Sequence, residues 1–108
     1  MATAAGTEDA VFAALAEPMR RRLLRLVGEH DGATATRLAE MLPVTRQAVH
    51  KHLTSLEAAG LVEGTRAGRE VRYRLRPAPL SEAMAWMTTV GAQWDARLGA
   101  LQRQFEEG

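Results

Sequence analysis

Two helix-forming segments joined by a tight turn constrain the fold of this chain more than any other feature of its sequence. Thr34 precedes the first segment, 35–42, and Thr45 begins the second, 45–59, and threonine is a favoured helix cap. Pro43 ends the first segment, so the connection between the two is very short. Helices joined by such a turn must cross steeply, which predicts a helix-turn-helix arrangement.

The second of these segments has two different faces. Val49, Leu53 and Leu56 recur at the spacing of one helical stripe and are expected to be buried. The opposite face and the cap are polar or basic, and comprise Thr45, Arg46, Gln47, His50, Lys51 and Thr54. One side of the helix is therefore suited to packing and the other to contacting a ligand.

The N-terminal part of the chain predicts two further helices. Residues 1–6 are small and are expected to be disordered, and Thr7 is the expected cap of the first helix. Pro18 ends that helix and suits the first position of the next. We therefore expect one domain over residues 7–108.

After Gly60 the apolar pattern changes to a period of two. Val71, Tyr73 and Leu75 alternate with arginines, which is typical of a strand, and a shorter apolar run precedes them. The sequence therefore predicts a β-hairpin over about 61–76. Arg66 and Arg69 flank its turn, so the tip is basic.

A long apolar stripe follows the hairpin and predicts a last helix over about 80–106, beginning at Ser81 or a neighbour. Its members recur at spacings of three and four: Leu80, Met84, Met87, Val90 or Gly91, Trp94, Leu98, Leu101 and Phe105. So long an apolar face is unusual on the surface of a chain of 108 residues. Together the elements predict a mainly α fold with a small β-hairpin, a winged helix-turn-helix with long N- and C-terminal dimerisation helices.

The charge of the chain is unevenly distributed. Residues 17–76 carry twelve Lys or Arg and seven Asp or Glu, whereas the two flanking segments together carry two and six. A basic central segment between acidic ends favours a polyanionic partner. Scattered surface charge is the alternative reading of the same numbers.

Double-stranded DNA is the partner that these features predict. The second helix of the pair can enter a major groove, where arginine pairs with guanine and glutamine with adenine. Thr45 and Lys51 suit phosphates, and Arg66 and Arg69, with Arg72 beside them on the hairpin, suit a minor groove or the backbone.

The run "LAEPMRRRLLRLV", followed by "TATRLAEMLPVTRQAVHKHLTSLEAAGLVEGTRAGREVRYRLRP", resembles the ArsR-type winged-helix repressors. The resemblance extends into the last helix, whose two tryptophans resemble a metal-independent branch of the family. It implies a homodimeric repressor that binds an inverted-repeat operator, often its own promoter. It also implies a dimer interface on the first and last helices, which here offer Phe12, Leu15, Met84, Met87, Val90, Trp94, Leu98 and Leu101.

Metal sensing and catalysis find little support in the residues. The chain has no cysteine, and its last helix has no histidine. His50 and His52 are two residues apart on a helix and cannot chelate one ion together. No nucleophile with an evident base is present. We therefore expect no metal, no cofactor and no enzymatic activity.

Two alternatives to a plain repressor remain at this point. A winged helix can bind protein instead of DNA, although an acidic or uncharged recognition face would then be expected. A small apolar inducer could also lie between the first and last helices, lined by Met84, Trp86, Met87 and Trp94. Because the sequence has neither a signal peptide nor a membrane-spanning apolar run, a cytoplasmic location is expected.

Overall fold

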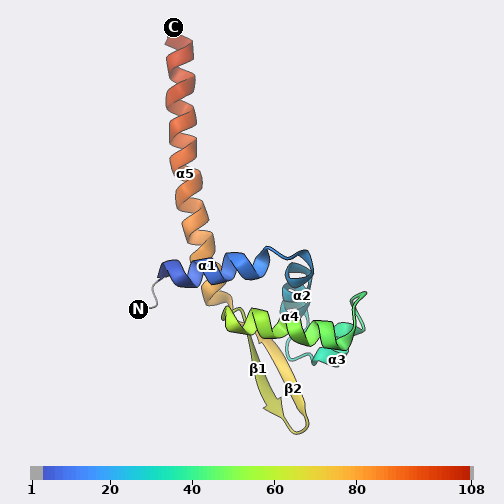
Figure 1. The fold of residues 1–108 in the computed structure, drawn as a ribbon. Helices are drawn as coiled ribbons and strands as arrows, with labels where there is room; N and C mark the ends of the chain where they lie inside the picture. Colours follow the sequence, from blue (N-terminus) through green and yellow to red (C-terminus); the bar gives the residue numbers. More distant parts are fainter. Residues whose placement is uncertain (1–3, 108) are drawn as a thin grey trace.

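The computed structural model describes residues 4–107, which form five helices and one antiparallel hairpin (Figure 1). Their order confirms the predicted winged helix-turn-helix. The elements are α1 (Ala4–Leu15), α2 (Pro18–Glu29), α3 (Ala35–Ala39), α4 (Arg46–Ala58), β1 (Val62–Ala67), β2 (Glu70–Leu75) and α5 (Pro77–Glu107).

The first helix begins earlier than predicted. α1 starts at Ala4, so residues 4–6, which we expected to be disordered, are helical and Thr7 lies inside the helix rather than at its cap. Alanine has the highest intrinsic helix propensity, and Ala4 and Ala5 extend the helix beyond the threonine. Residues 1–3 of the expected disordered segment lie outside the described residues.

Local capping sets the ends of the three central helices. Pro18 occupies the first turn of α2, as predicted, and the Glu17 carboxylate accepts a hydrogen bond from the Met19 amide at 3.1 Å. The hydroxyls of Thr34 and Thr45 accept amide hydrogen bonds at 3.1 Å and cap α3 and α4, which confirms both predicted caps. α3 ends at Ala39, three residues earlier than its apolar pattern indicated.

The core lies where α2, α3 and α4 meet the base of the hairpin. Val49, Leu53 and Leu56 of α4 are buried, as the stripe predicted. They pack in one cluster with α2, α3 and the start of β1, whose buried members include Leu23, Val27, Leu38, Leu61 and Val62. α4 is thereby seated by its apolar side and keeps its other side in solvent.

Two glycines with positive φ shape the hairpin, one in its turn and one just before its first strand. β1 and β2 pair antiparallel, with Gly64 opposite Tyr73. Gly68 has φ +65° at the first position of a two-residue turn, as in a type II′ hairpin. Gly60, with φ +77°, allows the chain to leave α4 and enter β1.

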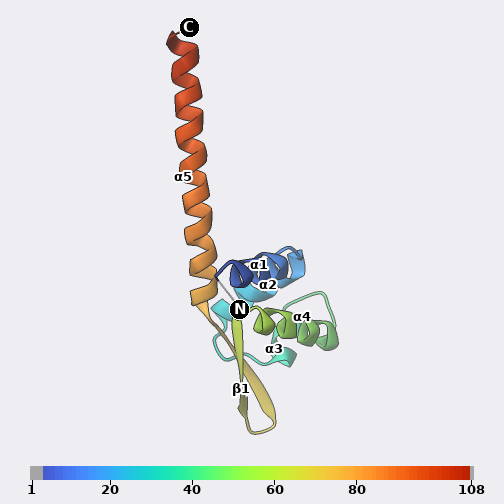
Figure 2. The ribbon, with the colours of Figure 1, turned by 60° about the vertical axis from the view of Figure 1, so that its left-hand side comes forward.

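α5 begins at Pro77, earlier than the predicted start near Ser81. A proline fits the first turn of a helix because the amides there have no helical partner, so Pro77 and Pro79 open this helix instead of delaying it. α5 packs mainly against α1. Its C-terminal half extends away from the rest of the chain in both views (Figure 1 and Figure 2). None of the helices among residues 4–107 is long and apolar enough to cross a membrane.

Candidate nucleic-acid interface

The polar face of α4 is open to solvent. All six side chains predicted to contact DNA from this helix and its cap are exposed: Thr45, Arg46, Gln47, His50, Lys51 and Thr54. Val49 and Leu53, on the same helix, are fully buried. A helix with one buried and one polar exposed side can enter a groove without disturbing the core.

Two threonine hydroxyls on this face are already engaged within the chain. Thr45 Oγ1 accepts the amide of Ala48, so its own hydrogen is free to be donated outward. Thr54 Oγ1 donates to the His50 carbonyl at 3.0 Å. Thr45 is therefore the better placed of the two to donate to a phosphate at the helix N-terminus.

The hairpin turn and the start of α4 share one shallow pocket. Its lining includes Arg46 and His50 from α4 and Arg69 from the hairpin turn. Thr34, Ala35 and Thr36 line it from the α3 side, and Glu70, Val71 and Tyr73 of β2 complete the lining. Thr36 is exposed, and no local pattern in the sequence singles it out, because no spacing rule links α3 to the hairpin. This shallow pocket is thus lined by residues of three separate parts of the fold: the α3 side, α4 and the hairpin.

The cations of this face differ from the other cations of the hairpin. Within the described part of the chain, no carboxylate lies at ion-pair distance from Arg46, Lys51, Arg66 or Arg69. In contrast, Arg74 pairs with Asp31 at 2.9 Å, and Arg76 pairs with Glu63 at 2.8 Å. The unpaired cations retain their charge for an external anion.

Arg72, the third predicted arginine of the hairpin, is engaged within the chain. Its guanidinium donates to the Gly32 carbonyl at 3.2 Å and to the Glu70 carboxylate at 3.1 Å. These two contacts tie β2 to the loop before α3, so Arg72 supports the hairpin instead of offering a free cation. Arg66 and Arg69 remain the exposed cations near the tip.

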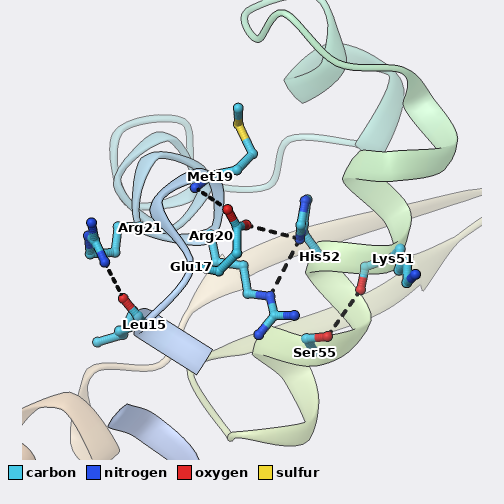
Figure 3. Close-up of polar contacts among 8 residues, drawn as sticks. All are labelled: Leu15, Glu17, Met19, Arg20, Arg21, Lys51, His52 and Ser55. Carbon is cyan, nitrogen blue, oxygen red and sulfur yellow. Dashed lines mark hydrogen bonds and ion pairs between the residues drawn. The ribbon is translucent and has the colours of Figure 1, made fainter. Parts of the chain in front are cut away.

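A polar cluster seats α4 against the start of α2 (Figure 3). His52 is half-buried, and its Nδ1 accepts from Nε of Arg20 at 3.4 Å. Oε2 of Glu17 lies 3.6 Å from the same nitrogen, while the other oxygen of Glu17 caps α2. His52 therefore has a structural role between the two helices, whereas His50 is exposed to solvent.

A second cluster joins the C-terminal end of α4 to the hairpin. The Glu57 carboxylate accepts the amide of Gly64 at 3.2 Å. Burial raises the pKa of the Tyr73 hydroxyl above its ordinary value, and the negative charge of Glu57 adds to the increase. Tyr73 also exchanges backbone hydrogen bonds with the loop before α3. The hairpin is therefore fixed to the helices at its base.

No group of three or more His, Asp or Glu side chains that could hold a metal ion occurs among the described residues. His52 points toward α2 and His50 toward the shallow pocket. The two histidines are consequently directed to different surroundings.

Most of the residues predicted to form a dimer interface are exposed within the single chain. Met84, Met87, Trp94, Leu98 and Leu101 are about half exposed, and so are the neighbouring Trp86 and, still more, Phe105. The two predicted residues of α1, Phe12 and Leu15, and Val90 of α5 are half-buried. Phe12 packs edge-to-face on Trp86 of its own chain, with ring centroids 5.5 Å apart, so part of its surface is used internally.

Comparisons with known proteins agree with this geometry. Residues 15–65 match a family model described as a helix-turn-helix domain. Two Bacillus subtilis proteins are similar: the HTH-type transcriptional regulator YuzN, with 40% identity over 59% of this chain and 76% of its own, and the transcriptional repressor SdpR, with 31% identity over 71% and 84%. A solved structure, an ArsR-like transcriptional regulator from Rhodococcus sp. RHA1, is 42% identical, covers 90% of this chain and 91% of its own, and has a TM-score of 0.77.

Proposed function

Because the chain belongs to the ArsR-type helix-turn-helix transcriptional regulators, we propose that it is a homodimeric repressor that binds an inverted-repeat operator through α4 and the hairpin. One observation carries this proposal: Arg46 and Arg69, which are exposed and have no carboxylate at ion-pair distance among residues 4–107, come from two elements and line one shallow pocket with His50. That combination matches a helix in the major groove flanked by a wing.

The side chains divide into two kinds of DNA contact. Arg46 and Gln47 lie in the first turn of α4, where a helix entering the major groove reaches base edges, and both can make bidentate contacts. Thr45, His50, Lys51 and Thr54 flank them and are suited to phosphates or neighbouring bases. Arg66 and Arg69 reach the backbone or the adjacent minor groove from the hairpin.

In this proposal, the protein represses transcription by occupying its operator. A dimer bound across an inverted repeat near the start of a gene excludes RNA polymerase, and its own promoter is one such site. The protein works without a metal ion, since the chain contains no cysteine and its last helix no histidine. Such a role places it in the cytoplasm, with the chromosome.

A binding titration tests the proposal. Fluorescence anisotropy of DNA from upstream of its own gene, with unrelated duplex as competitor, should show specific binding that weakens steeply with salt. The Trp94→Asp variant should sediment as a monomer, and in the anisotropy assay it should bind the operator far more weakly, because half of the contacts are lost. A protein that shows no preference for any DNA would contradict the proposal and favour a protein-binding winged helix.

A further inference from the structure

His52 lies on the side of α4 that faces away from the proposed DNA contacts. His50 and His52 are two residues apart, which is about 200° around a helix of about 3.6 residues per turn. His50 is exposed, whereas the side chain of His52 is only 19% exposed and lies against the start of α2 (Figure 3). Any influence of His52 on DNA binding must therefore pass through the placement of α4.

One ring nitrogen of His52 lies between a donor and an acceptor. Nε of Arg20 donates to Nδ1 at 3.4 Å, and Oε2 of Glu17 lies 3.6 Å from the same nitrogen. A ring nitrogen that accepts a hydrogen bond carries no proton, so the imidazole is neutral in this arrangement. Nδ1 can bond to Arg20 or to Glu17, but not to both at once.

The neutral arrangement leaves the carboxylate of Glu17 incompletely bonded. Oε1 accepts the amide of Met19 at 3.1 Å and caps α2. Oε2 is buried and accepts no hydrogen bond within residues 4–107. A buried acceptor without a donor is costly, and a proton on Nδ1 of His52 would supply that donor.

Protonation of His52 exchanges one contact for the other. A charge-assisted bond from Nδ1 to Oε2 has a length of about 2.7–2.9 Å, so the two atoms must approach by about 0.8 Å. The guanidinium of Arg20 keeps its charge, and it then loses its acceptor and faces a like charge. Because Oε1 of Glu17 is held at the cap of α2, the movement falls on His52 and with it on α4.

The other elements packed on α4 direct their charges elsewhere. Among residues 4–107, Glu17 is the only carboxylate at ion-pair distance from His52, and Arg20 is the only cation bonded to it. On α4 itself, the neighbouring His50 and Lys51 are exposed. The charged groups of α1, α3 and β1 that make no ion pair or hydrogen bond with His52 are Glu8, Asp9, Arg37, Glu40, Glu63 and Arg66.

We propose that Glu17, Arg20 and His52 are positioning residues for DNA recognition and that they make operator binding sensitive to pH. With His52 neutral, Arg20 holds α4 where its reading face and the hairpin share the shallow pocket. With His52 protonated, Glu17 replaces Arg20 and α4 shifts. A shift of about 0.8 Å is enough to lengthen hydrogen bonds to base edges beyond their range of about 2.7–3.2 Å. The inference rests on the proposed function and adds a regulatory signal to it.

Operator affinity measured across pH tests the proposal against one matched variant. His52→Asn keeps an acceptor oxygen near the position of Nδ1 but cannot gain a proton. His30 and His50 are present in both chains, so their protonation cancels from the ratio of the two affinities. The unchanged chain should lose about tenfold in affinity relative to His52→Asn between about pH 7.5 and about pH 5.5. A constant ratio, or a relative gain at low pH, would overturn the proposal.

Glu17→Gln tests the acceptor in the same assay. Glutamine keeps an oxygen for the cap of α2, but its uncharged amide stabilises a charged His52 far less than a carboxylate does. The loss of affinity at low pH, again relative to His52→Asn, should therefore shrink to about threefold or less. An undiminished tenfold loss would remove Glu17 from the exchange.

Nitrogen NMR of the chain without DNA separates this inference from the proposed function, and it needs no variant that has to fold. Nδ1 of His52 should be unprotonated at about pH 7.5 and protonated at about pH 5.5, and the Nε signal of Arg20 should shift over the same range. A proton on Nδ1 at the higher pH, or an unchanged Arg20 signal, would overturn the inference while leaving DNA binding intact. Failure to bind any operator at either pH would refute the proposed function instead.

Discussion

The salt dependence of DNA binding gives the sharpest prediction for the interface. Lys51, Arg66 and Arg69 are exposed and have no carboxylate at ion-pair distance among the described residues, so each is available to neutralise one phosphate. A dimer then neutralises about six phosphates, which gives a slope of log K against log salt of about −5.4. Affinity should fall by about 1800-fold between 50 and 200 mM salt.

Replacing Arg69 by Gln removes two of these contacts from the dimer. The slope should change from about −5.4 to about −3.6, and the same salt interval should then cost only about 150-fold in affinity. The loss should be similar for operator and unrelated DNA, because a phosphate contact carries little sequence information. Anisotropy titrations at four or more salt concentrations measure both slopes.

Arg74→Gln is the matched control on the same hairpin. Arg74 is paired with Asp31 at 2.9 Å and is therefore not expected to neutralise a phosphate. Its slope should stay close to that of the unchanged protein. If Arg74→Gln lowered the slope as much as Arg69→Gln, or if Arg69→Gln left it unchanged, the division into paired and unpaired cations would be wrong.

Three further predictions concern base reading, the core and the hairpin. Arg46→Ala and Gln47→Ala should each reduce discrimination between operator and unrelated DNA by about 1–3 kcal/mol in competition titrations, and unchanged selectivity for both would assign base reading elsewhere. Leu53→Ala should lower the free energy of unfolding by about 2–5 kcal/mol in urea, because Leu53 is fully buried beneath the reading face; a loss below 1 kcal/mol would contradict this seating of α4. Because the pKa of Tyr73 is raised in the folded chain, its contribution to stability is complete below the ordinary value of 10.0 and is lost as pH rises above it. Tyr73→Phe should therefore lose less stability than the unchanged protein between about pH 8 and about pH 11, as followed by thermal unfolding, and an equal loss would argue against this origin.

Features set by neighbouring residues were predictable from the sequence. The caps at Thr34 and Thr45 depend on a hydroxyl and an amide three residues away, and both form as expected. The buried stripe of α4 follows from spacing alone, because a single helix face must carry it. The exposed face opposite that stripe was therefore predictable as well.

Features that depend on tertiary contacts were not predictable in this way. Arg72 has the same sequence context as Arg74, and only the folded chain shows that it reaches the carbonyl of Gly32, forty residues away. Thr36 lines the shallow pocket because α3 lies against the hairpin, which no local pattern indicates. The sequence predicts too late a start for α5, because Pro77 and Pro79 were taken to end the hairpin and not to begin a helix. Proline is nevertheless compatible with the first turn of a helix, and α5 begins at Pro77.

Specific binding to DNA is the central claim, and a direct titration tests it best. The purified chain should be titrated against DNA from upstream of its own gene, at two salt concentrations and with excess unrelated duplex present. Binding that resists the competitor and weakens steeply with salt is the predicted result. Binding that is weak and equal for every duplex tested, including members of a random-sequence selection, would contradict a sequence-specific repressor.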